Sequence, residues 1–130
     1  MKIDTYSHAN FQVATIEKST PVTSILLTAD CLFEHSSHQM AINMIYTDLL
    51  LAGAGQYNRD DFLYAINELG ANISVSENDG RISVSVKTLD KNLTKILKLL
   101  ELMLSLPTFS EIECKRAIET TENALILYKD

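Results

Sequence analysis

Apolar and polar residues alternate with a period of two in four stretches of the chain. Two of these stretches lie near the N-terminus, at residues 11–16 and 22–27, with a Ser-Thr-Pro turn between them. The other two, at residues 72–76 and 82–88, flank Glu77-Asn78-Asp79-Gly80. Side chains of a strand alternate between its two faces, so this pattern predicts strands. The segment 77–80 supplies residues that tolerate left-handed turns, which predicts that the second pair is a β-hairpin.

Two helices are expected between these strand pairs. The stretch from Met40 to Leu50 is almost entirely apolar, which predicts a helix buried on more than one side that is ended by Gly53 and Gly55. The second helix begins at Asn58, a residue type that caps helix N-termini well, and two aspartates follow where the helix dipole favours negative charge. Its apolar face is formed by Phe62, Ile66 and Leu69.

Two further helices are expected after the second strand pair. Pro107 should end the first of them, and Ser110-Glu111-Ile112-Glu113 has the form of a capping box, so the last helix runs from Glu111 towards Leu127. The predicted order is β-β-α-α-β-β-α-α. It indicates an α+β fold, in which helices pack on one face of an antiparallel sheet. The apolar face of the third helix is formed by Leu93, Ile96, Leu97, Leu100, Met103 and Leu104.

The length and charge of the chain limit the kinds of function that it can have. The chain has 130 residues, which predicts a single domain over residues 1–130. Its net charge of −6, without a long Lys/Arg cluster, argues against binding to nucleic acid or to anionic membranes. Cys31 and Cys114 have no paired spacing and are expected to be reduced thiols. The first ten residues lack the apolar core of a signal peptide, so the expected location is the cytoplasm.

Residues 44–77 have a distinctive order. An apolar helix runs into Gly53, Tyr57 follows four positions later, an acidic helix begins, and Leu69-Gly70-Ala71 leads into a strand. This order resembles the active-site region of the M16 metallopeptidases, the insulinase, pitrilysin and mitochondrial-processing-peptidase group. Leu106-Pro107-Thr108-Phe109, followed by two glutamates, is similar to that family's Pro-x-Phe-x-Glu helix start.

The resemblance covers about residues 11 to 127 and implies the fold of the first half of an M16 domain. The chain would then be a half-domain that is truncated at its C-terminus, just after an apolar run. Active members carry HxxEH on the first helix. The two His side chains and a Glu from a later helix bind zinc there, and the Glu of the motif activates the metal-bound water.

In this register the motif falls on Met44-Ile45-Tyr46-Thr47-Asp48. Met44 and Asp48 replace the two His ligands and Thr47 replaces the Glu base. A thioether and one carboxylate are poor ligands for a catalytic zinc, so no catalytic residue and no cofactor are expected. The later helix offers Glu119 and Glu122 as counterparts of the third ligand. Without the His pair, we interpret both as exposed helix charges.

A second segment also carries ligand-type side chains. Cys31-Leu32-Phe33-Glu34-His35 has the shape of HxxEH with Cys in the first position, and His38 follows. These four polar residues could form a metal site. The segment lies ahead of the glycine that fixes the family register and directly follows a strand, so Cys31 and His35 need not share a helix face. The alternative interpretation is a strand end followed by a polar loop.

The sequence therefore predicts a non-catalytic M16-like protein or fragment with a structural and peptide-binding role. One alternative is a piece of a working zinc metallopeptidase whose catalytic residues lie outside this chain. Another is a metal-binding module built on Cys31, Glu34, His35 and His38. The expected partners are a peptide or protein, and an identical subunit or an M16-like one, because extended peptides and other chains add to open sheet edges.

Overall fold

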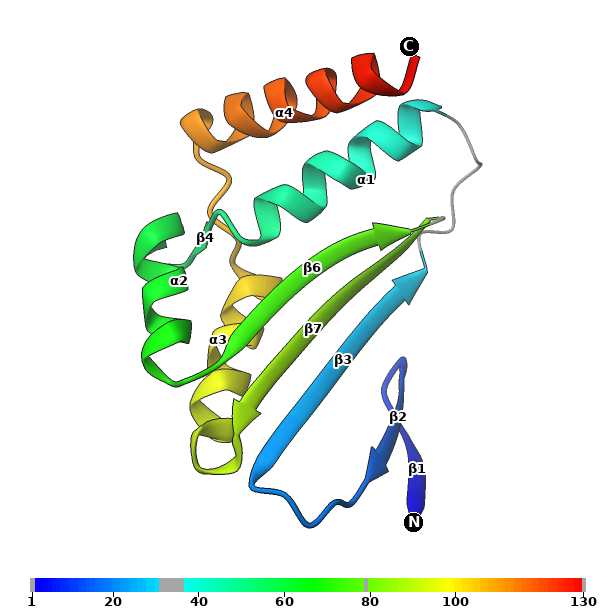
Figure 1. Ribbon diagram of the computed structural model, residues 1–130, viewed down its shortest axis with the longest axis vertical. Coiled ribbons are helices and arrows are strands. Elements are labelled where there is room, and N and C mark those ends of the chain that lie inside the picture. Colours follow the sequence, from blue (N-terminus) through cyan, green and yellow to red (C-terminus); the bar gives the residue numbers. More distant parts are fainter. Residues whose placement is uncertain (1, 31–36, 79, 130) are drawn as a thin grey trace.

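The computed structural model describes residues 2–30, 37–78 and 80–129, with side chains described for 2–30, 39–78 and 80–126. Its largest sheet has three strands in the order β3 (Val22–Asp30), β7 (Arg81–Leu89), β6 (Asn72–Asn78) (Figure 1). Both pairs are antiparallel, so the predicted hairpin is confirmed. The first of these strands runs three residues beyond the expected 22–27.

The first two strands in the chain form a separate hairpin. Strand β2 (Phe11–Ile16) pairs with β1 (Ile3–His8), a strand that the pattern did not predict. The expectation that residues 11–16 and 22–27 form a strand pair is therefore wrong. The β1–β2 turn needs only Ala9 and Asn10, whereas five residues ending in Pro21 separate β2 from β3. The short turn makes the β1–β2 pairing cheap in closure entropy, but it occupies only one edge of β2 and does not by itself exclude pairing with β3.

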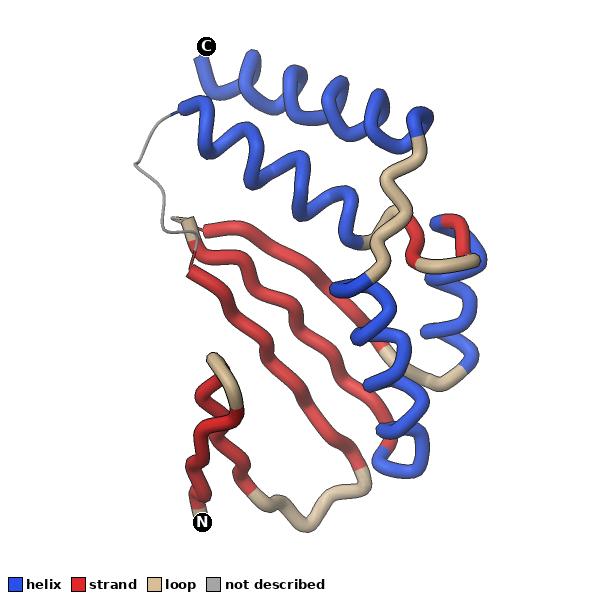
Figure 2. The backbone as a smooth tube through the Cα atoms, turned by 180° about the vertical axis from the view of Figure 1, so that it is seen from behind, coloured by secondary structure: helices blue, strands red, loops and turns tan. Residues whose placement is uncertain are grey.

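Four helices lie on one side of the large sheet (Figures 1 and 2). Helices α2 (Arg59–Glu68) and α3 (Leu93–Ser105) pack against the sheet face, and the 3-10 turn η1 (Asp90–Asn92) leads into α3. Helix α1 (Ser37–Leu50) lies along β6, and α4 (Glu111–Lys129) packs on α1. The α+β class with an antiparallel sheet is confirmed, but α1 separates α4 from the sheet. Among the described residues, no helix has the length and apolar run needed to cross a bilayer.

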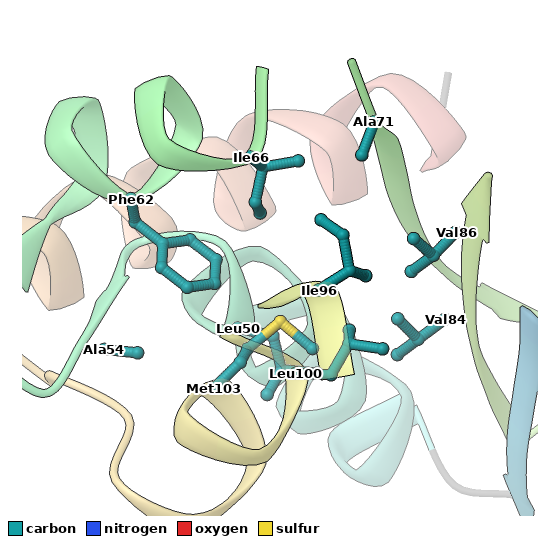
Figure 3. Close-up of a cluster of buried hydrophobic side chains, with 10 residues drawn as sticks. All are labelled: Leu50, Ala54, Phe62, Ile66, Ala71, Val84, Val86, Ile96, Leu100 and Met103. Carbon is teal, nitrogen blue, oxygen red and sulfur yellow. The ribbon is translucent and has the colours of Figure 1, made fainter. Parts of the chain in front are cut away.

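The main core lies between α2, α3 and the sheet (Figure 3). Helix α1 is buried on two sides as predicted, because Leu50 enters this core while Leu49 packs against Ala117 of α4. Leu97 and Leu104, expected on the buried face of α3, are each 48 % exposed. Because α3 packs on a single sheet, it buries only a narrow stripe of its surface. The apolar positions in its sequence cover a wider stripe than that. The core cluster consists of Leu50, Ala54, Phe62, Ile66, Ala71, Val84, Val86, Ile96, Leu100 and Met103.

A small second sheet joins the ends of the helices. Gly53, expected simply to stop α1, begins strand β4 (Gly53–Ala54), which pairs with β5 (Tyr57–Asn58). The segment between α3 and α4 adds to the other side of β4, because Thr108 donates its N–H to the Gly53 carbonyl at 3.1 Å. Gly53 has φ +124°, and a Cβ there would lie 2.6 Å from the Tyr57 carbonyl oxygen. Only glycine fits this position.

Candidate functional site

The residues that the M16 resemblance aligns with HxxEH lie on the C-terminal half of α1. Thr47, which the resemblance to the M16 family aligns with the catalytic Glu, is 9 % exposed. Its hydroxyl lies 2.8 Å from the Asn43 carbonyl oxygen and 2.9 Å from that of Met44, so the single proton is donated to the backbone of its own helix. A threonine hydroxyl held in this way is not a general base.

Asp48, which the resemblance to the M16 family aligns with the second His, lies beside a guanidinium. Arg59, the first residue of α2, donates two hydrogen bonds to Oε2 of Glu113, from Nε at 3.1 Å and from an Nη at 3.0 Å. The same Nη lies 3.8 Å from Oδ1 of Asp48 and 3.5 Å from the Asp48 carbonyl oxygen. This ion-pair cluster joins α1, α2 and the first turn of α4. The side chains of Arg59 and Glu113 are only 22 % and 13 % exposed.

Glu113 is the ionised partner of Arg59 in this cluster. The hydrogen bonds from Arg59 lower the pKa of Glu113 below its ordinary value, with further lowering by the positive charges of Arg59 and Arg116, while partial burial opposes them. Arginine stays protonated in proteins. The cluster therefore holds a permanent cation between carboxylates that come from different helices.

This arrangement does not fit a catalytic zinc. Met44 offers a thioether, Thr47 is bound to its own helix, and Asp48 faces a guanidinium that would repel a divalent cation. Nowhere in the described part of the chain do three His, Cys, Asp or Glu side chains gather into a potential metal site. Glu119 and Glu122 are exposed, whereas the buried positions of α4 are Ala117 and Thr121.

The second segment with ligand-type side chains lies outside the described residues. Cys31, Glu34 and His35 belong to the range 31–36, and only the backbone of His38, in the first turn of α1, is described. A metal site built on these four residues therefore remains a prediction.

Sequence reasoning missed Arg59, the residue that organises the cluster. A signal was present, because Arg59 occupies the first helical position of α2, where the dipole disfavours positive charge, next to two aspartates. A cation at such a place indicates a partner elsewhere in the fold.

The predicted capping box is half formed: Ser110 Oγ accepts the N–H of Glu113 at 3.3 Å, but the Glu113 carboxylate binds Arg59 instead of returning to the cap.

Comparison with known proteins finds similar structures but no similar sequence. No family model matches the sequence, and no curated protein matches it. The inactive domain of an M16 peptidase from Pseudomonas fluorescens superposes with a TM-score of 0.80 at 18 % identity, covering 89 % of this chain and 29 % of that one. A protease from Helicobacter pylori gives a TM-score of 0.79 at 17 % identity, covering 92 % of this chain and 29 % of the protease.

The chain thus spans less than a third of the length of either protein. At this level of identity the similarity establishes the fold alone. Together with the helix–glycine–strand framework around Gly53, it shows that the chain has an M16-like fold.

Proposed function

We propose that this chain is a non-catalytic M16-like domain with a structural and peptide-binding role. The observation that carries the proposal is the ion pair of Arg59 with Glu113 beside Asp48. Where an active member would hold a metal dication next to the second His, this chain holds a permanent guanidinium. The peptide-binding part is supported by the unpaired outer edge of β3, since an extended segment gains backbone hydrogen bonds there.

Metal analysis tests the non-catalytic part. After dialysis against metal-free buffer and addition of one equivalent of zinc, we expect no stoichiometric zinc on the chain and no rise in its melting temperature, because a bound ligand would stabilise the folded state. One zinc per chain that is lost on changing Cys31 or His35 to Ser would contradict the proposal and favour the metal-binding module.

A restoration series tests the register of the motif. The triple variant Met44→His, Thr47→Glu and Asp48→His brings back the zinc-binding side chains, but Arg59 still opposes the metal. Adding Arg59→Gln removes that cation and frees the Glu113 carboxylate, so we expect the quadruple variant to bind zinc more tightly than the triple one. Equal zinc affinity of the two variants would show that residues 44–48 and Arg59 do not share one site.

Peptide binding is tested with a short unstructured peptide carrying a fluorescent label. We expect its fluorescence anisotropy to rise with protein concentration while the peptide stays intact. Cleavage that is abolished by a chelator would overturn the non-catalytic assignment.

The second candidate is part of a working zinc metallopeptidase whose catalytic residues lie outside this chain. The specific support is the similarity to a protease that is more than three times as long as the matched region. For the partners, we propose association with an identical or M16-like chain, because an unpaired sheet edge can accept a strand of another chain.

A further inference from the structure

The outer edge of β3 is open along its whole length. Strand β3 pairs with β7 over nine residues and stands at the end of the sheet order. Within the described part of the chain, no strand pairs with its other side. An edge strand of this length presents a row of backbone N–H and C=O groups that pair readily with another strand.

The two edges of the sheet differ. Along β6 the helix α1 packs against the strand, as Figure 1 shows. Among the described residues, the β1–β2 hairpin is what lies beside β3, and its strands are hydrogen-bonded to each other. The edge at β3 therefore has no strand hydrogen-bonded to it in the described part of the chain.

The residues of β3 suit pairing with an identical strand. Between Val22 and Ala29 the strand contains no charged side chain, and its centre is Ile25-Leu26-Leu27. Leu26 is 67 % exposed on the sheet face opposite the helices. Its neighbours across the sheet on that face are serines, Ser85 and then Ser74, so the sheet offers it no apolar contact in its row.

We propose that β3 pairs antiparallel with β3 of a second copy of this chain, around a two-fold axis at Leu26. This inference deepens the association part of the proposed function and rests on it. In that register Leu26 lies opposite Leu26 of the second copy, and Ile25 lies opposite Leu27, so apolar side chains meet on both faces. Ser24 then lies opposite Thr28, because both are two residues from the axis. A continuous sheet with the strand order β6-β7-β3-β3-β7-β6 results.

Charge does not prevent this contact. Each copy has a net charge of −6, but residues 22–29 carry none of it. Asp30 at the end of the strand is neutralised by Arg81 of its own chain, with Nε 2.8 Å from Oδ1. The side chains that meet near the axis are apolar or carry hydroxyl groups, and these pair favourably across antiparallel strands.

Disulfide cross-linking tests the register. In the full chain with Cys31→Ser and Cys114→Ser, Leu26→Cys should give a disulfide-linked dimer on mild oxidation. Residues directly opposite each other in antiparallel strands have Cα atoms about 4.5–5.5 Å apart, within disulfide range. Ser24→Cys and Thr28→Cys should cross-link when mixed but not alone. The control Ser74→Cys, on β6 and the same face, should stay monomeric on a non-reducing gel.

A charge substitution provides the second measurement. Leu26→Lys leaves the core intact but places two ammonium groups opposite each other, so sedimentation equilibrium should show dimer dissociation constants at least about tenfold higher. Ser74→Lys, with the same charge on the same face, should leave the dimer unchanged.

Two results would overturn the inference in distinguishable ways. A dimer that ignores Leu26→Lys and lacks the Leu26→Cys cross-link would place the contact elsewhere and leave the proposed association standing. A monomer at all concentrations tested would remove both the β3 contact and the association. The non-catalytic assignment is decided separately, by metal analysis.

Discussion

At the scale of single residues, the ion pairs of Arg59 join three helices. Arg59 reaches across from α2 to Glu113 on α4 and lies near Asp48 on α1. Because removing one partner of a partly buried ion pair leaves the other charge without compensation, the cluster stabilises the fold only while all its members are present. The cluster therefore has a structural role that can be measured as stability.

Glu113→Gln should lower the free energy of unfolding at pH 7 by about 1–2 kcal/mol, since the hydrogen bonds from Arg59 would then end on a neutral acceptor instead of a charged one. The pKa of Glu113 is lowered in the folded state from its ordinary value of 4.5. Its stabilisation is therefore present above that pH and is lost as pH falls through the lower folded-state pKa. Urea unfolding between pH 7 and pH 3 should show a smaller loss of stability in the variant.

The matched control is Glu111→Gln, in the same turn of α4. Glu111 is 85 % exposed and contacts only Lys115 among the ion pairs of the described residues. An exposed pair of this kind contributes little, so its loss should cost less than about 0.5 kcal/mol. Equal effects of the two substitutions would mean that Arg59 does not stabilise the fold through Glu113.

Gly53→Ala should destabilise the chain by more than about 2 kcal/mol, because the new Cβ meets a carbonyl oxygen at 2.6 Å and the backbone has φ +124°. Gly70→Ala is the control: its φ is +66°, but a Cβ there would meet only a Leu89 methyl carbon at 3.8 Å. That control should cost about 1 kcal/mol. Thermal or urea unfolding of both variants decides whether the close approach or the dihedral alone sets the cost.

At the scale of elements, the strands differ in how deeply their side chains are buried. Strand β7 lies between two other strands and contributes Val84 and Val86 to the core. The β1–β2 hairpin is exposed along both strands, with Val13 alone half-buried among its strand residues. Isolated two-stranded hairpins are marginally stable in water.

Hydrogen exchange should separate these elements. Backbone amides of β7 should open only with global unfolding, whereas those of β1 and β2 should exchange with opening free energies near zero. Mass spectrometry of exchanged peptides measures both in one experiment. Strong protection of β1 and β2 at low protein concentration would instead indicate that the hairpin has docked on the β3 edge of its own chain.

At the scale of the whole molecule, helices cover one face of the large sheet and leave the other face uncovered (Figure 2). The bare face carries Ser74, Ser76, Ser83 and Ser85 in adjacent rows. A layer of this kind offers its edges, rather than this face, for apolar contact with a second copy.

Self-association should strengthen with salt. Each copy carries a net charge of −6, and the apolar contact proposed at β3 does not depend on ion pairs between copies. Raising ionic strength from about 0.05 M to about 0.5 M shortens the Debye length and screens the repulsion. We expect the dimer dissociation constant from sedimentation equilibrium to fall about threefold or more. A rise would indicate a contact held by opposite charges.

Local patterns in the sequence determined the second strand pair, the four helices and the α+β class. The 72–88 hairpin and the Asn58 cap follow from neighbours in the chain, and the structure shows both: the Asn58 carboxamide accepts the N–H of Asp61 at 2.8 Å. The M16-like fold was predictable because glycines at fixed places have backbone requirements that other residues cannot meet.

The tertiary structure decided what depends on distant residues. Pairing of β2 with β1 rather than β3, the burial of α1 between the sheet and α4, and the contact of Arg59 with Glu113 join segments that the sequence pattern does not connect. The alternation of apolar and polar residues in a strand predicts which residues share a face of the sheet. It does not predict which other strand pairs with that strand. The physical reason is the same in each case: propensity and periodicity act over a few residues, whereas pairing, packing and charge compensation are settled by which surfaces meet when the chain folds.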